Sequence, residues 1–177
     1  TSSKVAEKAV ESGAAIVNDI SAGTADKQML ETVASLGVPF IAMHMQGTPK
    51  TMQNNPTYQN VVSDVFDALE RFSNRASQLG IDQLILDPGF GFGKTLTHNY
   101  QILKQLEKFH SLGCPLLVGV SRKSMIQQVL DVGAENALNG TTAIHTIAAQ
   151  KGACILRAHD VKEAVQVFQL INYLNQQ

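Results

Sequence analysis

Short apolar runs alternate with longer amphipathic segments along the chain, and a glycine separates each amphipathic segment from the run that follows it. This arrangement occurs five times, at Gly13, Gly37, Gly80, Gly113 and Gly152. Glycine is favoured at the end of a helix because the chain turns there through the left-handed region. The runs are apolar at consecutive positions, as expected of strands buried on both faces. The pattern predicts an α/β fold with a parallel sheet.

The amphipathic stripes place the expected helices. They indicate helices over residues 4–12, 25–36 and 58–79, one from about residue 98, a short one over 125–132, one over 139–150 and a last one from 161. Asn139 or Thr141 is the expected N-terminal cap of the helix over 139–150, and Asp160 that of the last helix. The strands are expected to end near residues 20, 46, 87, 120 and 158. Residues 1–177 are therefore expected to form one domain, with no second domain.

Polar side chains follow the apolar run in all five units. They are Asn18, His44, Asp87, Lys123 and the pair Arg157 and His159. In a (β/α)8 TIM barrel such strand ends form one rim, whereas a doubly wound sheet gathers them only where its strand order reverses. The sequence thus favours a TIM barrel of which about five βα units are present. Because the chain opens directly on a helix, we expect the N-terminal strands of the barrel to be missing.

Bulk composition narrows the classes of partner. The 177 residues are 44% hydrophobic and 16% charged, with a net charge of −1 and no basic block, so a nucleic-acid surface is not expected. No apolar run has the length of a membrane span, and the first residues do not form a signal peptide, which makes a cytoplasmic location the default. Cys114 and Cys154 have no metal-binding spacing, and both are expected to be reduced thiols in the core.

The stretch LILDPGFGFGKT, residues 84–95, is the most distinctive part of the sequence. An apolar strand delivers Asp87 to a glycine-rich loop that ends in Lys94, an arrangement typical of the wall of a ligand site. A phosphate-binding Walker A loop is excluded, because its first glycine would fall on Pro88. The stretch could also be a plain glycine-rich connection whose carboxylate only caps the next helix.

Residue types at the rim indicate two kinds of recognition. Asp87 and Asn18 can read a heterocycle rich in N–H groups, whereas Arg157 and His159, two residues apart, can hold a phosphate. Lys123 adds a mobile cation. Each residue also has an ordinary explanation. Asn18 can complete a turn, and His44 can be a hydrogen-bonded core residue. Arg122 and Lys123 can be a solvated pair. Together they favour a substrate with a heterocycle at one end and a phosphate or pyrophosphate at the other.

Five motifs in order give a more specific resemblance. NDI (18–20), MHMQGTPKTMQ (43–53), LDPGFGFGK (86–94), GVSRKSMI (119–126) and RAHDV (157–161) closely resemble the bacterial dihydropteroate synthases, pterin-binding TIM barrels, over their C-terminal two thirds. The resemblance implies condensation of 6-hydroxymethyl-7,8-dihydropterin pyrophosphate with p-aminobenzoate, in an SN1-like step of folate synthesis that releases pyrophosphate. It also implies Mg²⁺, competition by sulfonamides and a homodimer formed through the late helices, whose expected stripe includes Val165, Phe168 and Ile171.

The resemblance also implies roles for individual residues. Asn18, Asp87 and Lys123 would hold the pterin between the apolar walls Ile20 and Met43, and Gly119 would let its ring approach the backbone. Arg157 and His159 would hold the pyrophosphate, and Phe92, Lys123 and Ser124 would border the p-aminobenzoate. The catalytic residues implied are Asp87, Lys123, Arg157 and His159. No metal ligand is certain in this chain, since the family's asparagine ligand, a pterin-binding aspartate and two flexible loops would precede Thr1.

Three other functions remain open. A pterin-dependent methyltransferase barrel shares the Asn and Asp wall but needs no pyrophosphate clamp. A truncated, non-catalytic homologue would bind pterin or a partner chain without turnover. The chain itself is expected to be a fragment of a longer synthase, not active alone, because five strands cannot close a barrel. A generic phosphate-binding α/β enzyme would be indifferent to pterins.

Overall fold

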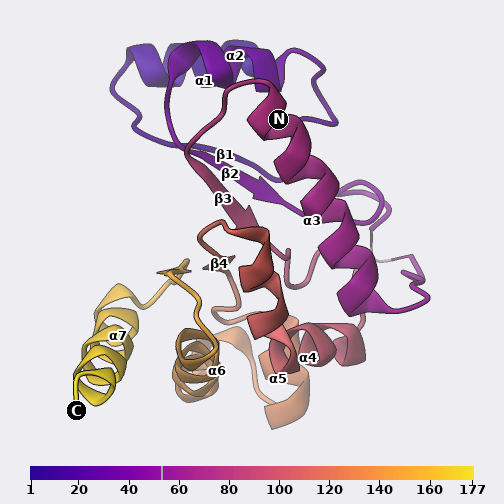
Figure 1. The fold of residues 1–177 in the computed structure, drawn as a ribbon. Coiled ribbons are helices and arrows are strands. Elements are labelled where there is room, and N and C mark those ends of the chain that lie inside the picture. The colour runs from indigo at the N-terminus through magenta and orange to yellow at the C-terminus, as the bar shows by residue number, and fades with distance from the viewer. Residues whose placement is uncertain (53) are drawn as a thin grey trace.

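Five short parallel strands form the centre of the molecule (Figure 1). The computed structural model describes residues 1–52 and 54–177, so the last residue of the motif over 43–53 lies outside the described part. The strands are β1 (Val17–Asp19), β2 (Phe40–Met43), β3 (Leu84–Asp87), β4 (Leu117–Val118) and β5 (Ile155–Leu156).

Strands that are adjacent in sequence are also adjacent in space. β1 pairs with β2 and β2 with β3, both in parallel, and β4 pairs with β5. A single parallel bridge from Leu86 to Leu116 joins β3 to β4. The order therefore never reverses, as in a barrel and unlike a doubly wound sheet. This arrangement confirms the predicted fold class, part of a TIM barrel with five strands among the described residues.

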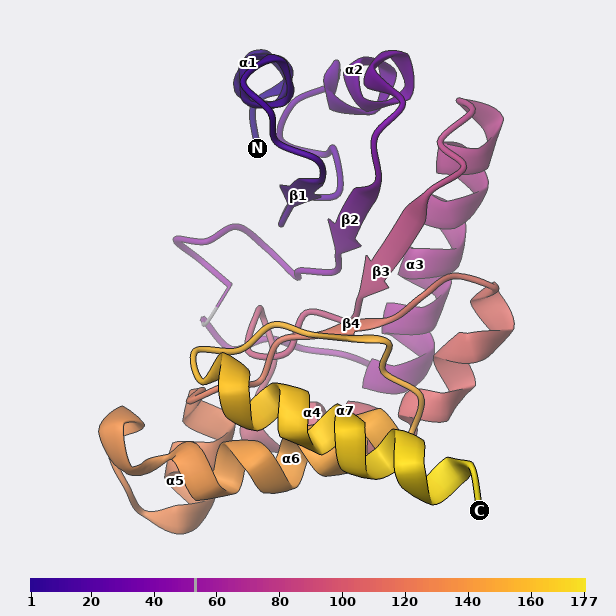
Figure 2. The same ribbon diagram turned by 90° about the vertical axis from the view of Figure 1, so that its left-hand side faces the viewer.

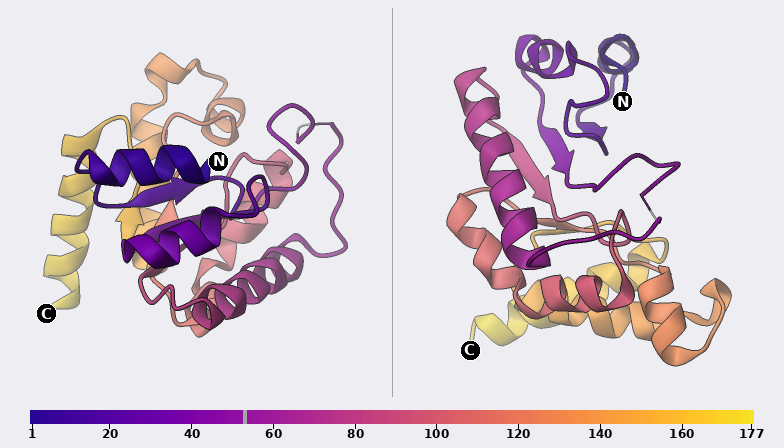
Figure 3. Two further views of the ribbon diagram at one scale, coloured as in Figure 1. Left: turned by 90° about the horizontal axis from the view of Figure 1, so that it is seen from above. Right: turned by 90° about the vertical axis from the view of Figure 1, so that its right-hand side faces the viewer.

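Helices connect successive strands and cover the outside of the sheet (Figure 2). The α-helices are α1 (Ser3–Glu11), α2 (Met29–Leu36), α3 (Val61–Gln78), α4 (Leu96–Lys104), α5 (Ser124–Leu130), α6 (Leu138–Gln150) and α7 (Val161–Asn175). Two 3₁₀ helices are η1 (Leu106–Leu112) and η2 (Ala134–Asn136). α1 packs beside α2 at one end of the molecule, and α6 beside α7 at the other (Figure 3).

Helix ends are partly as predicted. All five separating glycines have positive φ, which confirms their role as turns. α2 begins four residues later than expected, because the buried Asp19 carboxylate accepts the backbone N–H groups of Ser21 and Gly23 and so holds the chain in turns.

Two predicted caps are wrong. Neither Asn139 nor Thr141 caps α6 in the described structure, and the Thr141 hydroxyl instead accepts the Arg122 backbone N–H at 3.0 Å. Asp160 occupies the N-cap position of α7, as predicted, but its carboxylate accepts hydrogen bonds from Arg122 and makes no described side-chain cap to the helix. Both side chains therefore connect segments that are distant in sequence.

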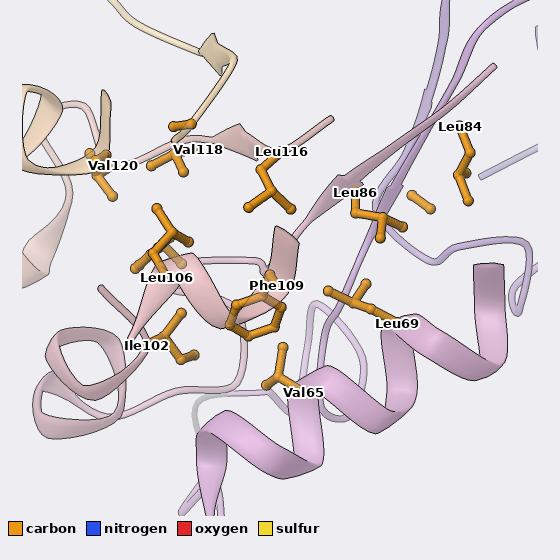
Figure 4. Packing of buried hydrophobic residues seen from close by; sticks show 14 of the residues in the cluster. Val65, Leu69, Leu84, Leu86, Ile102, Leu106, Phe109, Leu116, Val118 and Val120 are labelled. Carbon is orange, nitrogen blue, oxygen red and sulfur yellow. The ribbon is translucent and has the colours of Figure 1, made fainter. Parts of the chain in front are cut away.

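The main core lies between the strands and the helices α3, α4 and η1 (Figure 4). Leu69 of α3 points toward Leu86 of β3, and Val65 points toward Phe109 of η1, which is fully buried. Burying such side chains contributes roughly 1.5–3 kcal/mol each. This packing fixes the strand ends from which the polar side chains project.

The two cysteines differ from each other. Cys114 is half-buried, whereas Cys154 is exposed, so the prediction that both lie in the core is wrong for Cys154. Its neighbour Ala153 takes the inward position. Both cysteines are free thiols. Among the described residues, no helix combines the length and the apolar character needed to cross a membrane.

Candidate active site

The C-terminal ends of β4 and β5 border a small cavity of about 160 Å³. Its lining residues are Gly119, Ser121, Lys123, Arg157, Ala158 and His159. Four of them were predicted from the sequence to belong to the site. The structure therefore brings the predicted phosphate-binding residues together around one space.

Asp87 ends β3 and is only 4% exposed. Its carboxylate accepts the Gly89 backbone N–H at 2.7 Å. Burial raises the pKa of Asp87, while this hydrogen bond and the charges of Lys123, Arg157 and Lys94 oppose the rise. The capping explanation is wrong, because Thr95 caps α4 through the His98 N–H. Asp87 is thus a buried acid that faces three cations.

Lys123 connects the two sides of the rim. Its ammonium group donates to the Phe90 carbonyl oxygen at 2.5 Å and lies 4.8 Å from the centre of the Phe92 ring. Burial lowers its pKa to about 8, with Asp87 opposing and Arg157 adding to the effect. The alternative in which Lys123 is a solvated residue is therefore wrong.

Arg157 and His159 both follow β5, which ends at Leu156. The expectation that the strand continues to residue 158 is wrong, yet both side chains line the cavity. A Cβ atom at position 119 would lie 3.2 Å from Arg157 Nε, so Gly119 makes room for the guanidinium. Ser121, which the sequence analysis did not single out, accepts the His159 backbone N–H at 3.1 Å and lies 3.0 Å from its Nδ1.

Arg122 forms an ion pair and is only partly solvated. Its guanidinium makes two hydrogen bonds to the Asp160 carboxylate, at 2.6 and 3.0 Å. Its backbone has a φ of 53°, a conformation that is unusual for arginine. The pair fastens the segment containing Lys123 to the segment containing His159. Nothing in the sequence around Asp160 indicated that it would pair with Arg122.

The remaining predicted residues lie elsewhere. Asn18 is exposed on β1 and lines a separate cavity of about 180 Å³ beside α1. Ile20 and Met43 line another of about 220 Å³, together with His44. Ser124 is exposed at the start of α5. Phe92 does not line the Lys123 cavity, but its ring contacts the Lys123 ammonium group. The described structure does not unite these residues with the Lys123 cavity.

His44 and Lys94 form a buried contact that the sequence analysis did not predict. Lys94 is 3% exposed, and its ammonium lies 3.0 Å from His44 Nδ1. Burial lowers the pKa of Lys94 to about 7. Burial and then Lys94 lower that of His44 to about 3. His44 is hydrogen-bonded, as its ordinary explanation predicts, but it is half-buried and lines a cavity, so it is not a core residue.

A magnesium site does not emerge from these residues. Among the described residues, no group of three His, Cys, Asp or Glu side chains could hold a metal ion. The cavity is lined by nitrogen donors that repel a cation, and Mg²⁺ prefers oxygen ligands. The described residues therefore do not fit a resident Mg²⁺ ion.

Known proteins resemble the chain over nearly all of its length. A family model described as pterin binding enzyme matches residues 1–159. The dihydropteroate synthase of Escherichia coli strain K12 is 46% identical over 170 residues, which cover 95% of this chain and 60% of that enzyme. The chain thus spans about 60% of the length of this curated relative.

Solved structures give the same result. The Yersinia pestis dihydropteroate synthase in complex with a sulfonamide drug has a TM-score of 0.95 and 41% identity, over 99% of this chain and 64% of that one. The Xanthomonas albilineans dihydropteroate synthase in complex with 7,8-dihydropteroate has a TM-score of 0.90 and 36% identity, over 98% and 64%. Because the family model matches residues 1–159 and the solved dihydropteroate synthases have the same fold, the chain belongs to the pterin-binding enzyme family.

Proposed function

We propose that this chain provides the pterin and pyrophosphate walls of a dihydropteroate synthase. The reaction joins 6-hydroxymethyl-7,8-dihydropterin pyrophosphate to p-aminobenzoate, gives 7,8-dihydropteroate and releases pyrophosphate. One observation carries the proposal: Lys123 lines a cavity with Arg157 and His159, and it also donates to the Phe90 carbonyl oxygen in the loop that follows the buried Asp87. The relatives that bind a sulfonamide drug and 7,8-dihydropteroate support the same function.

Asp87 is suited to bind the pterin. An ionised carboxylate only accepts hydrogen bonds, and the pterin edge presents an amino group and a ring N–H. As pyrophosphate departs, positive charge develops on the exocyclic carbon of the pterin. The Asp87 carboxylate offsets that charge in a site where water screens little. Asn18, Ile20 and Met43 would complete this wall once substrate and the rest of the barrel are in place.

Arg157, His159 and Lys123 are suited to hold the leaving group. In the SN1-like reaction the carbon–oxygen bond to pyrophosphate breaks first, and both bonding electrons go to the pyrophosphate oxygen. Arg157 can bind two of its oxygens, and His159 can donate a hydrogen bond or a proton. The amine of p-aminobenzoate then forms the carbon–nitrogen bond and loses a proton. Phe92, Lys123 and Ser124 would border this second substrate.

Three properties implied by the family remain part of this proposal. Any Mg²⁺ would take its ligands from pyrophosphate oxygens and water, as is common for this ion. The location would be cytoplasmic. A homodimer would form through α7, where Val165, Leu170 and Tyr173 are exposed. The predicted dimer stripe is partly wrong, because Ile171 is buried and Phe168 half-buried.

The test is pyrophosphate release from the dihydropterin pyrophosphate with p-aminobenzoate and Mg²⁺. It is run on the 177-residue chain and on the chain joined to the segment that precedes its counterpart in the E. coli enzyme. Release that is lost in Lys123→Ala but kept in Lys104→Ala, an exposed lysine on α4, supports the proposal. If neither form releases pyrophosphate in a Lys123-dependent manner, the proposal is wrong.

The same experiment separates the alternatives. Pterin binding without turnover in both forms indicates a non-catalytic homologue. A pterin-dependent methyltransferase would bind pterins without a pyrophosphate group equally well, and the cavity formed by Arg157 and His159 argues against it. Binding of phosphate without any preference for pterins indicates a different phosphate-binding enzyme.

A further inference from the structure

Lys94, the last residue of the glycine-rich stretch, has no role in the reaction as proposed. It is nevertheless 3% exposed, and its ammonium lies within hydrogen-bonding distance of four atoms. These are the carbonyl oxygens of Gly89 at 2.9 Å and Phe92 at 3.0 Å, His44 Nδ1 at 3.0 Å and, more distantly, the His44 carbonyl oxygen at 3.4 Å. A buried ammonium must be fully hydrogen-bonded to be tolerated. Lys94 meets that requirement with backbone groups of two segments.

The contact with His44 fixes the state of the imidazole. Below its pKa of about 7, Lys94 is protonated and has only donors, so His44 Nδ1 then acts as the acceptor and the ring proton sits on Nε2. A second proton on His44 would place two cations 3.0 Å apart. Lys94 therefore holds His44 in one neutral tautomer and links the segment after β2 to the segment after β3.

These two segments are packed with no room for side chains. A Cβ atom on Gly89 would collide with the His44 carbonyl oxygen, and one on Gly93 would lie 2.5 Å from that of Gln46. The Tyr58 hydroxyl donates to the Gly93 carbonyl oxygen at 2.7 Å. Lys94 thus lies at the centre of a close contact that sets the path of the chain from Asp87 to Phe92.

Lys94 and Asp87 both bond to Gly89, whose N–H donates to the Asp87 carboxylate at 2.7 Å and whose carbonyl oxygen accepts from Lys94 at 2.9 Å. Three cations oppose the rise of the Asp87 pKa, and they differ in their surroundings. Lys123 and Arg157 line the cavity where an anionic ligand would bind. Lys94 is enclosed by protein, with His44 and the carbonyl groups around it and the His98 ring also within electrostatic reach. A bound pyrophosphate would compete with Asp87 for Lys123 and Arg157 but could not reach Lys94.

We propose that Lys94 is a positioning residue. It holds the segment 88–93 against the segment 44–47, and it remains the counter-charge of Asp87 while Lys123 and Arg157 bind an anionic ligand. The identity of that ligand as the pterin pyrophosphate rests on the proposed function.

The test compares Lys94→Met, which has similar length without charge, with Lys94→Arg, which keeps the charge, and Lys104→Met as the exposed control. The Asp87 carboxyl group is titrated by carbon-13 NMR in each ligand-free protein, and affinity for 6-hydroxymethylpterin is measured by fluorescence between pH 5 and 9. We expect the Asp87 titration in Lys94→Met to move to higher pH, because the enclosed cation is gone. Pterin affinity at pH 6, where Lys94 is charged, should fall about tenfold or more. Lys94→Arg should recover most of both, and Lys104→Met should match the wild type.

Two results would overturn the inference. One is an unchanged Asp87 titration in Lys94→Met, and the other is equal loss of affinity in Lys94→Met and Lys94→Arg at every pH, which indicates structure alone. If Lys94→Met does not fold, the measurement is made on the wild type. The nitrogen-15 NMR signal of the Lys94 ammonium group should then change at the pH at which the Asp87 carboxyl group titrates. If it does not change there, the electrostatic coupling of Lys94 to Asp87 is refuted. If the Asp87 titration shifts but no protein binds pterin, the proposed function fails and the role of Lys94 stands.

Discussion

The two sides of the rim are built differently. At the ends of β2 and β3, Asp87 and Lys94 are buried, and glycines allow the backbone segments to touch. At the ends of β4 and β5, Arg157 and His159 are exposed, and the Arg122–Asp160 ion pair holds their segments together. One side is thus fixed by close packing around a buried charge, and the other by side chains that reach across partly solvated loops.

The difference fits the two parts of the proposed substrate. A flat, neutral heterocycle is less strongly hydrated than a pyrophosphate, and a rigid, buried carboxylate can replace the water at its N–H groups and so select it by hydrogen bonds. A pyrophosphate is strongly hydrated, so its binding residues gain from remaining near solvent. Lys123 connects the sides, since it contacts Phe90 and Phe92 of the first and lines the cavity of the second.

Asp87→Asn gives the largest expected effect on the buried side. The amide keeps the shape of the side chain, but one of its two terminal atoms becomes a donor, and it can no longer offset positive charge. We expect kcat/KM for pyrophosphate release to fall about 10²–10³-fold, the cost typical of losing one group that stabilises transition-state charge. Steady-state kinetics measure it in whichever form of the chain is active. Glu70→Gln, a neutralised exposed carboxylate on α3, serves as the control. A fall in kcat/KM of less than tenfold would mean that the buried side does not stabilise the charge of the pterin as proposed.

Gly89→Ala tests the close packing and has a matched control. Gly89 and Gly80 have almost the same φ, 73° and 76°, but only at Gly89 would a Cβ atom meet another segment, while at Gly80 nothing lies within 4 Å. We expect Gly80→Ala to lower the free energy of unfolding by about 1 kcal/mol, from backbone strain alone. Gly89→Ala should cost about 2–3 kcal/mol more, because the segments must separate. Denaturant unfolding measures both, and equal losses would show that the contact is not tight.

Much of this architecture was predictable from the sequence, because periodicity and glycines report local structure. The five turn glycines, the strand order and the gathering of Lys123, Arg157 and His159 follow from patterns that are visible without coordinates. The pairs that hold the rim together were not predictable. Arg122–Asp160 and Lys94–His44 join residues 38 and 50 positions apart, and no local rule distinguishes them from surface or capping residues.

The same limit explains the wrong caps. Thr141 lies inside α6, which begins at Leu138, and Asp160 stands at the N-cap position of α7, but each side chain hydrogen-bonds Arg122 and caps neither helix. Tertiary contacts thus took the hydrogen-bonding groups that local statistics assigned to helices. Asn18 is the opposite case, since its place on β1 is as expected, yet the described residues leave it exposed in a different cavity.

His44→Asn sharpens the comparison through pH. The unfolded chain binds a proton at His44 near its ordinary pKa of 6.5, whereas burial and Lys94 lower the pKa in the folded chain to about 3. Between these values the unfolded state binds more protons, so stability falls as the pH falls. His44 should contribute about 1.4 kcal/mol per pH unit to that slope. His44→Asn keeps an acceptor for Lys94 without the titration, so its unfolding free energy should depend less on pH between 6 and 4. Identical slopes in urea unfolding would contradict the buried contact.

Arg122→Gln should have the smallest effect and shows how the exposed side differs. The residue touches no proposed substrate atom, and its ion pair is partly solvated, so the fold should survive its loss. The pair nevertheless sets the distance between the segments of Lys123 and His159. We therefore expect the KM for the pterin pyrophosphate to rise about fivefold with kcat nearly unchanged, and the affinity for p-aminobenzoate to stay the same.

Asp160→Asn should give a similar change, and the double variant should be no worse than either single variant, because both substitutions remove the same interaction. Additive losses would mean that Arg122 and Asp160 act separately. A fall in p-aminobenzoate affinity would mean that the ion pair also positions Phe92 and Ser124, so that the two sides of the rim are not independent.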